Sequence, residues 1–259
     1  MIEDNKELEV AISAAKVAGE ILKKNFGMKY RVIRKSPREM VSEIDIQSQQ
    51  AIMEVLKKHD PSCEIISEEK LFFEKKQGKG WVIDPIDGTH NYIAGLPFSG
   101  ISIGLVEDDV FRLGVIHFPM EDELYYTVKG QGAYRNGKQI LVSDNPDLSK
   151  AVIHYDNQFH LSEKSFDYYK ELTERAFTTR IFGVATKDLC LIASGVIDGR
   201  IWNSTKIVDI AAGIVMVTEA GGQITEFNGD SCNVNSKQVV ASNGKVHSQL
   251  LEIFKEKSK

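Results

Sequence analysis

The sequence predicts an α+β protein in which helices and sheets pack in layers. Three observations lead to this fold class: an amphipathic helical pattern near the N-terminus, a β-rich middle with hairpin turns, and a second half that mixes apolar helices with short strands. Helices and hairpins are grouped rather than strictly alternating, so α+β layers fit better than a doubly wound sheet. Without repeats or a clear linker, residues 1–259 are expected to form one unit with an N-terminal half, 1–145, and a C-terminal α/β half, 146–259.

The N-terminal half is predicted to begin with two helices and to continue as an antiparallel sheet. Apolar residues recur at helical spacing over 3–26 and 43–58, and Gly27 is a plausible stop for the first helix. Polar, Pro- or Gly-containing stretches at 36–39 and 70–80 are predicted loops. The predicted strands share β-branched or aromatic runs beside turn residues; they are 30–33, 64–67, 81–84, 99–106, 110–117, 124–128, 132–134 and 140–142.

The C-terminal half is predicted to alternate between the two kinds of element. An Ala-rich apolar run that stops at Gly221 and Gly222 is typical of a buried helix. The predicted helices are 161–177, 186–193, 208–220 and 247–255, and the predicted strands are 151–154, 199–202, 223–226 and 239–241.

Charge and cysteine content exclude several classes of function. The net charge is −5 and no basic tail or stripe is present, so a nucleic-acid partner is not expected. Three scattered cysteines do not form a disulfide framework and indicate a reducing compartment. No apolar run approaches the roughly 20 residues that cross a bilayer, and the acidic N-terminus lacks a signal-peptide core. We therefore expect a cytoplasmic protein with no membrane partner.

The segment 81–89, Trp-Val-Ile-Asp-Pro-Ile-Asp-Gly-Thr, carries the strongest functional signal. An apolar strand ends in two carboxylates, Asp84 and Asp87, and ligands of layered α/β proteins collect at such strand ends. Paired carboxylate oxygens suit a divalent cation such as Mg²⁺. A helix that starts near Gly88 and Thr89 would present free N–H groups to a phosphate.

Three further acids lie at the edges of predicted elements. Asp45 and Asp209 begin helices, and Glu68 ends a strand. Buried acids repel one another unless a cation neutralises them, so a shared metal site is one interpretation. The alternatives are helix capping for Asp45 and Asp209, a solvated surface for Glu68, and a tight turn for 84–88. The residues alone leave these interpretations open.

Together these motifs resemble the inositol monophosphatase family of lithium-sensitive, Mg²⁺-dependent phosphatases. Residues 81–89, extended by Asn91, resemble the first family signature, and residues 208–213 with 219–222 resemble the second. The segments 66–69 and 41–45 resemble two further acidic elements, with Ser67 in place of a glycine. The likeness runs from about residue 8 to residue 245.

The resemblance implies an αβαβα sandwich, as in the related fructose bisphosphatases, and commonly a homodimer. It implies two to three Mg²⁺ ions, with inhibition by Li⁺ and Ca²⁺. Glu68, Asp84 and the carbonyl of Ile86 would bind the first ion. Asp84, Asp87 and Asp209 would hold the second, and a third, weaker ion would use Glu68 and water.

The resemblance also implies how the ester is attacked. Catalytic roles fall to Asp45, Thr89 and Glu68: Thr89, hydrogen-bonded to Asp45, would position or deprotonate a metal-bound water. That water would attack the phosphate directly, without a phosphoenzyme. The amides of Gly88 and Thr89 would hold phosphate oxygens.

The implied substrate is inositol monophosphate, a phosphate monoester. The residues expected to contact it, besides Gly88 and Thr89, are His90, Asn91, Gly183, Ala185, Trp202 and Asp209. Animal enzymes hold inositol hydroxyls with a Glu where this chain has Trp202 or Asn203, and a tryptophan cannot accept a hydrogen bond. Trp202 would stack on a ring or fill the core.

Other substrates and a non-enzymatic role stay open. Lys187 or Arg200 could meet a second phosphate, so NADP(H) 2′-phosphate, phosphoadenosine phosphate and fructose bisphosphate are alternatives in the same site. A non-catalytic regulatory protein is a further alternative, although a protein that had lost catalysis would be expected to have lost one of the acids.

Overall fold

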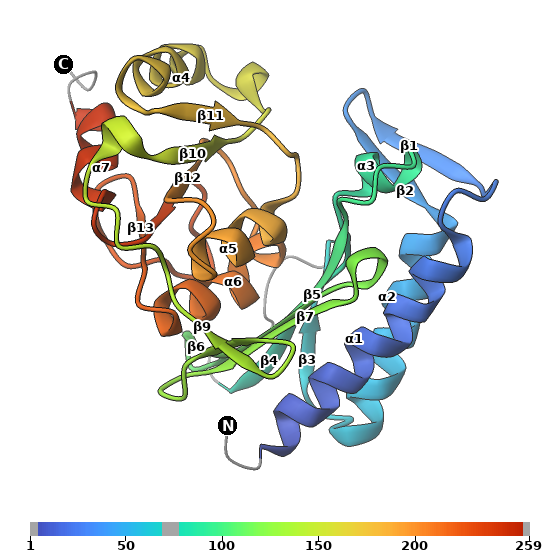
Figure 1. The fold of residues 1–259 in the computed structure, drawn as a ribbon. Helices are drawn as coiled ribbons and strands as arrows, with labels where there is room; N and C mark the ends of the chain where they lie inside the picture. Colours follow the sequence, from blue (N-terminus) through green and yellow to red (C-terminus); the bar gives the residue numbers. More distant parts are fainter. Residues whose placement is uncertain (1–4, 69–77, 256–259) are drawn as a thin grey trace.

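Two β-sheets alternate with three pairs of helices in the computed structural model, which describes residues 5–68 and 78–255 (Figure 1). The layers follow the order helix pair, seven-stranded sheet, helix pair, five-stranded sheet, helix pair, so the predicted α+β sandwich is confirmed. In the order of the layers, the helices are α1 (Lys6–Asn25) and α2 (Glu43–His59), then α5 (Ala185–Ala193) and α6 (Ile207–Glu219), then α4 (Lys164–Arg175) and α7 (His247–Lys255).

The seven-stranded sheet follows chain order from one edge to the other. Only its first pair of strands is parallel, and every other neighbouring pair is antiparallel. The strands are β3 (Glu64–Ile66), β4 (Lys79–Asp87), β5 (Gly100–Glu107), β6 (Val110–Phe118), β7 (Glu123–Val128), β8 (Ala133–Arg135) and β9 (Lys138–Ile140).

The five-stranded sheet is mixed and belongs to the C-terminal half. Its spatial order is β11 (Thr178–Arg180), β10 (Val152–Tyr155), β12 (Gly199–Trp202), β14 (Val239–Ser242) and β13 (Gln223–Glu226). Strand β10 runs parallel to both of its neighbours, and the other pairs are antiparallel.

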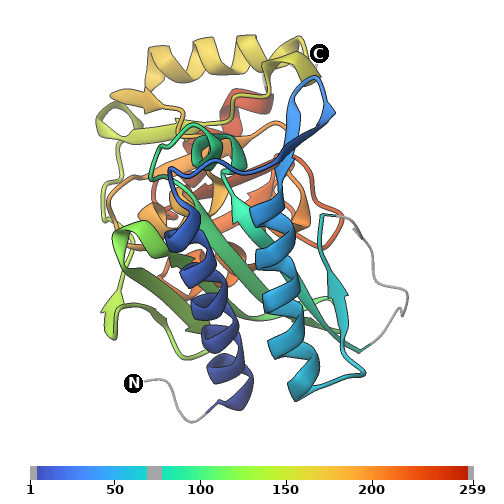
Figure 2. The same ribbon diagram turned by 90° about the vertical axis from the view of Figure 1, so that its right-hand side faces the viewer.

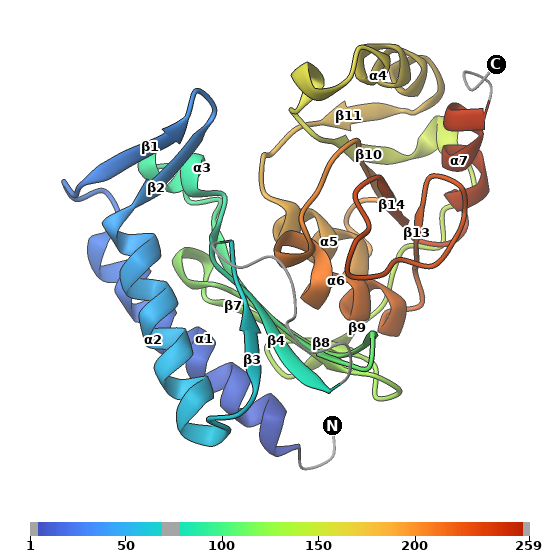
Figure 3. The ribbon, with the colours of Figure 1, turned by 180° about the vertical axis from the view of Figure 1, so that it is seen from behind.

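Short elements complete the fold and reach toward the space between the two halves. A hairpin of β1 (Val32–Ser36) and β2 (Glu39–Ser42) precedes α2, and α3 (Thr89–Ile93) follows β4. Figure 3 shows this hairpin and α3 on one side and the five-stranded sheet on the other. Three 3₁₀ turns lie at η1 (Pro119–Glu121), η2 (Leu148–Lys150) and η3 (Phe159–Leu161).

Several predicted boundaries were wrong. The predicted strand 30–33 lies at Val32–Ser36 and pairs with a strand that was not predicted, so the loop 36–39 shrinks to the turn at Pro37 and Arg38. The predicted strand 140–142 ends at Ile140, because Val142 leaves the sheet and donates its N–H to the carbonyl of Ala220, the residue after α6. The predicted helix 161–177 is shorter because η3 takes its start, and strand β11 follows where the helix was expected to end. Most of the predicted loop 70–80 lies outside the described residues, and Lys79 begins β4.

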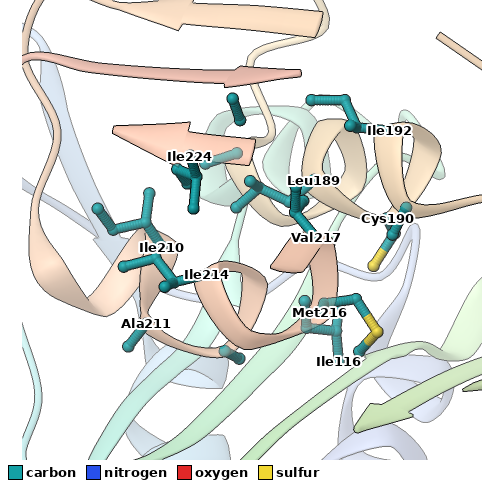
Figure 4. Close-up of a cluster of buried hydrophobic side chains, with 14 of the residues drawn as sticks. Ile116, Leu189, Cys190, Ile192, Ile210, Ala211, Ile214, Met216, Val217 and Ile224 are labelled. Carbon is teal, nitrogen blue, oxygen red and sulfur yellow. The ribbon is translucent and has the colours of Figure 1, made fainter. Parts of the chain in front are cut away.

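The Ala-rich helix α6 lies directly on the seven-stranded sheet. A Cβ atom on Gly114 of β6 would come within 2.3 Å of the carbonyl oxygen of Ala212, so only glycine permits this approach. Gly104 of β5 faces Gly114 across the strand pair and also touches α6. Leu189 and Met216 lie in the apolar cluster that fills the central layer (Figure 4). Because α6 packs so closely on the sheet, it is held in a fixed position beside β4 and β5.

The outer layers cover the remaining sheet faces. Helices α1 and α2 pack side by side on the far face of the seven-stranded sheet (Figure 2). Because helices cover both faces, β4 is buried along all but its first residue, which explains its continuous apolar run. Among the described residues, no helix is long and apolar enough to cross a membrane.

Candidate active site

A cavity of about 600 Å³ lies between the two halves of the chain. It opens where the end of β4 meets the N-terminus of α6, and both halves contribute to its walls. Most of the site residues predicted from the sequence line it: Glu68, Asp84, Ile86, Asp87, Gly88, Thr89, His90, Gly183, Ala185, Trp202 and Asp209. Asp45 lies behind Thr89, and Asn91 does not line the cavity, since its amide donates to the carbonyls of Phe98 and Phe182.

A β-bulge in β4 brings its two acids to the same cavity. Asp84 pairs with Ser102 and Asp87 pairs with Gly100, so β4 has one residue more than β5 over this stretch. In a regular strand, residues three apart point to opposite faces. The extra residue at the bulge restores Asp87 to the face of Asp84, and both carboxylates reach the cavity. The sequence pattern predicted the two acids at the end of a strand, but it ended that strand at Asp84, whereas β4 continues through the bulge to Asp87.

Each of three acids that line this end of the cavity has one carboxylate oxygen held by the protein. The Ile86 amide donates to Asp84 Oδ1 (3.0 Å). Asp87 Oδ2 accepts two bonds of 2.6 Å from the amide and the hydroxyl of Thr186. Asp209 Oδ2 accepts from the Lys206 amide at the start of α6 (3.1 Å). The second oxygens of Asp84 and Asp209 have no such bond among the described residues, and the amide of Ala185 also donates to Asp87.

Asp45 and Thr89 form the contact that the family resemblance implied. Thr89 Oγ1 lies 2.9 Å from both Asp45 Oδ1 and the carbonyl oxygen of Ile86. Ser42 holds the other oxygen of Asp45 through its amide (2.7 Å) and its hydroxyl (2.5 Å). These bonds are also a capping box for α2, so Asp45 both caps a helix and positions Thr89.

Burial and mutual repulsion perturb the cavity acids strongly. Burial, followed by the charges of Asp87, Asp209 and Glu68, holds the pKa of Asp84 well above its usual range. Burial and the charge of Asp87 raise the pKa of Asp209 to about 7. Burial also raises the pKa of Asp87, against the hydrogen bonds from Thr186, which lower it. The cluster therefore holds more negative charge than the surrounding protein neutralises.

Lys206, the residue just before α6, was not predicted as part of the site. Its ammonium lies 2.8 Å from Glu39 of the hairpin and 3.4 Å from Glu68. Burial disfavours its charge, but the hydrogen bond to Glu39 and the charge of Glu68 outweigh that effect and raise its pKa. A lone cation directly before an apolar helix was the available signal in the sequence.

The acid cluster fits a magnesium site by its chemistry. Its donors are carboxylate oxygens and the Ile86 carbonyl, which are the hard ligands that Mg²⁺ prefers. The raised pKa values indicate that these acids lack a counter-charge. Within residues 5–68 and 78–255, no three His, Cys, Asp or Glu side chains already converge as ligands of one ion.

The opposite wall of the cavity has charged side chains that are already paired. Arg200 of β12 pairs with Asp188 and donates to the carbonyl of Val184 (3.3 Å). Asp156 accepts from the amides of Gln158 (2.7 Å) and Asn203 (2.6 Å). Asp156 was missed by the sequence reading, although a polar residue directly after an apolar strand was a signal.

Trp202 is buried in the core. Only 2% of the residue is exposed, and the Arg200 guanidinium covers one face of its ring at 4.6 Å. The core-filling alternative agrees with this position, and stacking on a substrate ring would require Arg200 to move.

Two further sequence predictions concern the edges of the cavity. Lys187 does not line it, because its ammonium binds Glu121 (2.5 Å) and Glu123 (3.0 Å) of the N-terminal half. At the mouth, Arg38 of the hairpin lies 3.1 Å from His160 of η3, a contact between the halves that the sequence did not reveal.

The fold and the acid-lined cavity define the class of inositol monophosphatase- and fructose bisphosphatase-like proteins. Comparison with known families places the chain within it. The model of the inositol monophosphatase family matches residues 3–259, and the chain belongs to that family. It is thus a member of a phosphatase family whose enzymes are generally Mg²⁺-dependent.

Known relatives cover nearly the whole chain but differ in their described roles. The chain is 37% identical to a fructose-1,6-bisphosphatase/inositol-1-monophosphatase of Aquifex aeolicus, over 96% of each chain. It is 34% identical to Nus factor SuhB of Pasteurella multocida, over 95% of each. Among solved structures, the Thermotoga maritima IMPase superposes with a TM-score of 0.89 at 32% identity, covering 97% of this chain and 98% of that one.

Proposed function

We propose that this protein is a Mg²⁺-dependent phosphomonoesterase that hydrolyses inositol monophosphate to inositol and phosphate. The observation that carries the proposal is the set of three acids on one cavity, of which Asp84 and Asp87 are buried and Asp209 is half-buried. Each has one oxygen held by the protein and a second oxygen available to a cation. Acids placed so close together repel one another and destabilise the fold unless a bound cation neutralises them.

The cation would be held by Glu68, Asp84, Asp87, Asp209 and the carbonyl of Ile86. When bound there, Mg²⁺ supplies positive charge that stabilises the phosphate oxygens and lowers the pKa of water. Phosphate monoesters react through a loose transition state, so positioning and charge account for most of the catalysis. No nucleophilic side chain is required.

Thr89 would receive and orient the attacking water. Its hydroxyl donates to Asp45 Oδ1 or to the carbonyl of Ile86, which leaves its oxygen lone pairs to accept a proton of that water. Asp45 is held by Ser42 on its other oxygen, which keeps Asp45 Oδ1 within hydrogen-bond distance of the Thr89 hydroxyl. Asp45 is the group through which a proton from water would be relayed.

The phosphate would lie against the start of α3. Gly88 has φ 85°, and a Cβ there would come within 2.8 Å of Val184 and 2.9 Å of the carbonyl of Phe98. Glycine therefore lets the backbone turn tightly enough for Gly88 and Thr89 to face the cavity. The first amides of a helix have no helical acceptor and can donate to phosphate oxygens.

The charges of the opposite wall favour a neutral polyol as the leaving group. Arg200 is already paired with Asp188, and Asp156 adds a negative charge beside it. Lys187 is engaged outside the cavity. A second phosphate would find no free buried cation on this wall among the described residues, whereas polyol hydroxyls can both donate to Asp156 and accept from neighbouring amides.

A substrate panel tests the proposal. Phosphate release would be measured from inositol 1-phosphate, fructose 1,6-bisphosphate, phosphoadenosine phosphate and NADP, each with Mg²⁺ and with EDTA. We expect Mg²⁺-dependent turnover with the highest kcat/KM for inositol 1-phosphate. A higher kcat/KM for any of the other three would show that this compound, and not inositol 1-phosphate, is the preferred substrate. The Mg²⁺-dependent phosphatase reaction would still stand.

A non-catalytic role is the second candidate, favoured by the likeness to proteins described as Nus factor SuhB. Absence of phosphate release from every ester in the panel would favour it. Inhibition by Li⁺ and Ca²⁺, a cytoplasmic location and a homodimer are predictions from the family resemblance. Inhibition assays, fractionation and light scattering test them in turn.

A further inference from the structure

Three consecutive polar side chains are buried in the first turn of α5. Thr186, Lys187 and Asp188 are 0%, 6% and 0% exposed, although the helix lies in the apolar central layer. Buried polar groups are costly unless each finds a partner. Their partners therefore indicate what this turn does.

Thr186 connects the two halves of the chain at the acid cluster. Its amide and its hydroxyl both donate to Asp87 Oδ2 at 2.6 Å. Thr186 belongs to the C-terminal half and Asp87 ends β4 in the N-terminal half. The N-cap of α5, Val184, provides no side-chain hydrogen bond, so the carboxylate of Asp87 caps this helix from another part of the chain.

Lys187 fastens the same turn to the N-terminal half at a second point. Its ammonium binds Glu121 and Glu123, and it lies 4.4 Å from the centre of the Phe118 ring. The first turn of α5 is therefore attached to the N-terminal half at two points, which fixes the position of Thr186 relative to β4.

We propose that Thr186 is a positioning residue that directs one oxygen of Asp87 toward the cation. Two short bonds to the same oxygen prevent the carboxylate from rotating about its last torsion. Oδ2 is held on α5, which leaves Oδ1 as the oxygen that can reach a cation in the cavity that Asp84 and Asp209 also line. Partners behind a metal ligand are known to set its orientation and affinity. The inference rests on the proposed function, because it assigns Asp87 to the cation site.

The test compares threonine variants by Mg²⁺ affinity, measured by calorimetry without substrate. Thr186→Val keeps the shape and the backbone amide but removes the hydroxyl donor. We expect Mg²⁺ to bind this variant about 10- to 100-fold more weakly. Thr186→Ser retains the hydroxyl and is expected to bind as the unaltered protein does. At saturating Mg²⁺, most of the lost kcat of Thr186→Val should return.

The matched control is Thr127→Val. Thr127 is also fully buried, and its hydroxyl donates to the carbonyl of Gly132, just before β8 and outside the cavity. This variant should lower the melting temperature and leave Mg²⁺ affinity unchanged. If Thr186→Val fails to fold, Thr186→Ala removes the same hydroxyl without adding a methyl group beside the carboxylate.

The outcomes separate this inference from the proposed function. Unchanged Mg²⁺ affinity in Thr186→Val or Thr186→Ala would overturn the positioning role and leave helix capping as the whole explanation. If the unaltered protein binds Mg²⁺ but releases no phosphate, the proposed function fails while calorimetry still decides the role of Thr186.

Discussion

The two ends of the cavity treat their charges in opposite ways. At the β4 end, the protein holds one oxygen each of Asp84, Asp87 and Asp209, and the second oxygens of Asp84 and Asp209 have no partner within residues 5–68 and 78–255. At the β12 end, Arg200 is paired with Asp188 and both oxygens of Asp156 accept backbone amides. The negative charge at the β4 end therefore lacks a counter-charge, whereas the charged groups at the β12 end are paired or hydrogen-bonded within the protein.

This difference separates binding from scaffolding. A carboxylate group with unmet charge is unstable on its own and gains by taking a cation. A charged pair whose partners both lie within the protein contributes to the shape of the wall. Removing one partner leaves the other buried and without a hydrogen-bond partner. Substitutions at the first end should therefore change ion binding, and those at the second should change stability.

Loss of a cavity acid is expected to have the largest effect. In Asp84→Asn or Asp209→Asn, kcat should fall about a thousandfold or more, because an uncharged amide holds Mg²⁺ poorly. Steady-state kinetics and calorimetric Mg²⁺ titration measure the change. The control is Asp198→Asn, a buried acid outside the cavity that accepts from Ser143 and Val152. Near-normal turnover in either cavity variant would show that the metal assignment is wrong.

Breaking the pair at the other end should act on stability. Arg200→Met leaves Asp188 buried without its cation and should lower the free energy of unfolding by about 3 kcal/mol. Urea denaturation measures the loss. Arg200→Met with Asp188→Asn should recover part of it, since the stranded charge is gone. Weaker Mg²⁺ binding by Arg200→Met, at unchanged stability, would contradict the division between the two ends.

Thr89 should affect the rate without affecting ion binding. Thr89→Val removes the hydroxyl that Asp45 orients, and kcat is expected to fall about a hundredfold. Mg²⁺ affinity should stay near that of the unaltered protein, because the acids are intact. Thr89→Ser keeps the hydroxyl and provides the control. Equal kcat for Thr89→Val and Thr89→Ser would show that the Thr89 hydroxyl takes no part in the reaction.

The acid end could be predicted from the sequence, because the acids follow apolar runs. Asp84 and Asp209 stand beside buried elements where a surface residue would not be expected, and this local pattern is visible without the fold. The layered α+β class could be predicted for the same reason, since periodicity reports burial. The bulge that brings Asp84 and Asp87 to the same face could not be predicted from the sequence, because it depends on how β4 pairs with β5.

The β12 end could not be predicted because its partners are distant in the chain. Lys187 and Arg200 looked available to a phosphate, yet Glu121 and Asp188 already hold them. Asp156 joins the wall only because β10 lies beside β12. A charge that is satisfied by long-range contacts has the same sequence signature as a free one.

Stability against pH provides the smallest and most direct test of unmet charge. In the metal-free protein, Asp209 has a pKa raised to about 7, whereas the unfolded chain releases this proton near the usual pKa of 3.8. Between these values the folded state holds a proton that the unfolded state has lost. The Asp209 contribution to stability is therefore present at low pH and is lost as the pH rises toward 7.

Buried histidines act in the opposite direction, so the measurement needs a reference. Burial lowers the pKa of His117 and lowers that of His247 to about 4, and these groups destabilise the protein as the pH falls below 6.5. The difference in melting temperature between the unaltered protein and Asp209→Asn removes their effect. In EDTA, this difference should fall by a few degrees from pH 5 to pH 7. With Mg²⁺, the stabilisation of the unaltered protein should grow over the same range, because the ion binds deprotonated acids. A difference that stays constant in EDTA would mean that Asp209 already has its counter-charge within the protein, and the contrast between the two ends of the cavity would disappear.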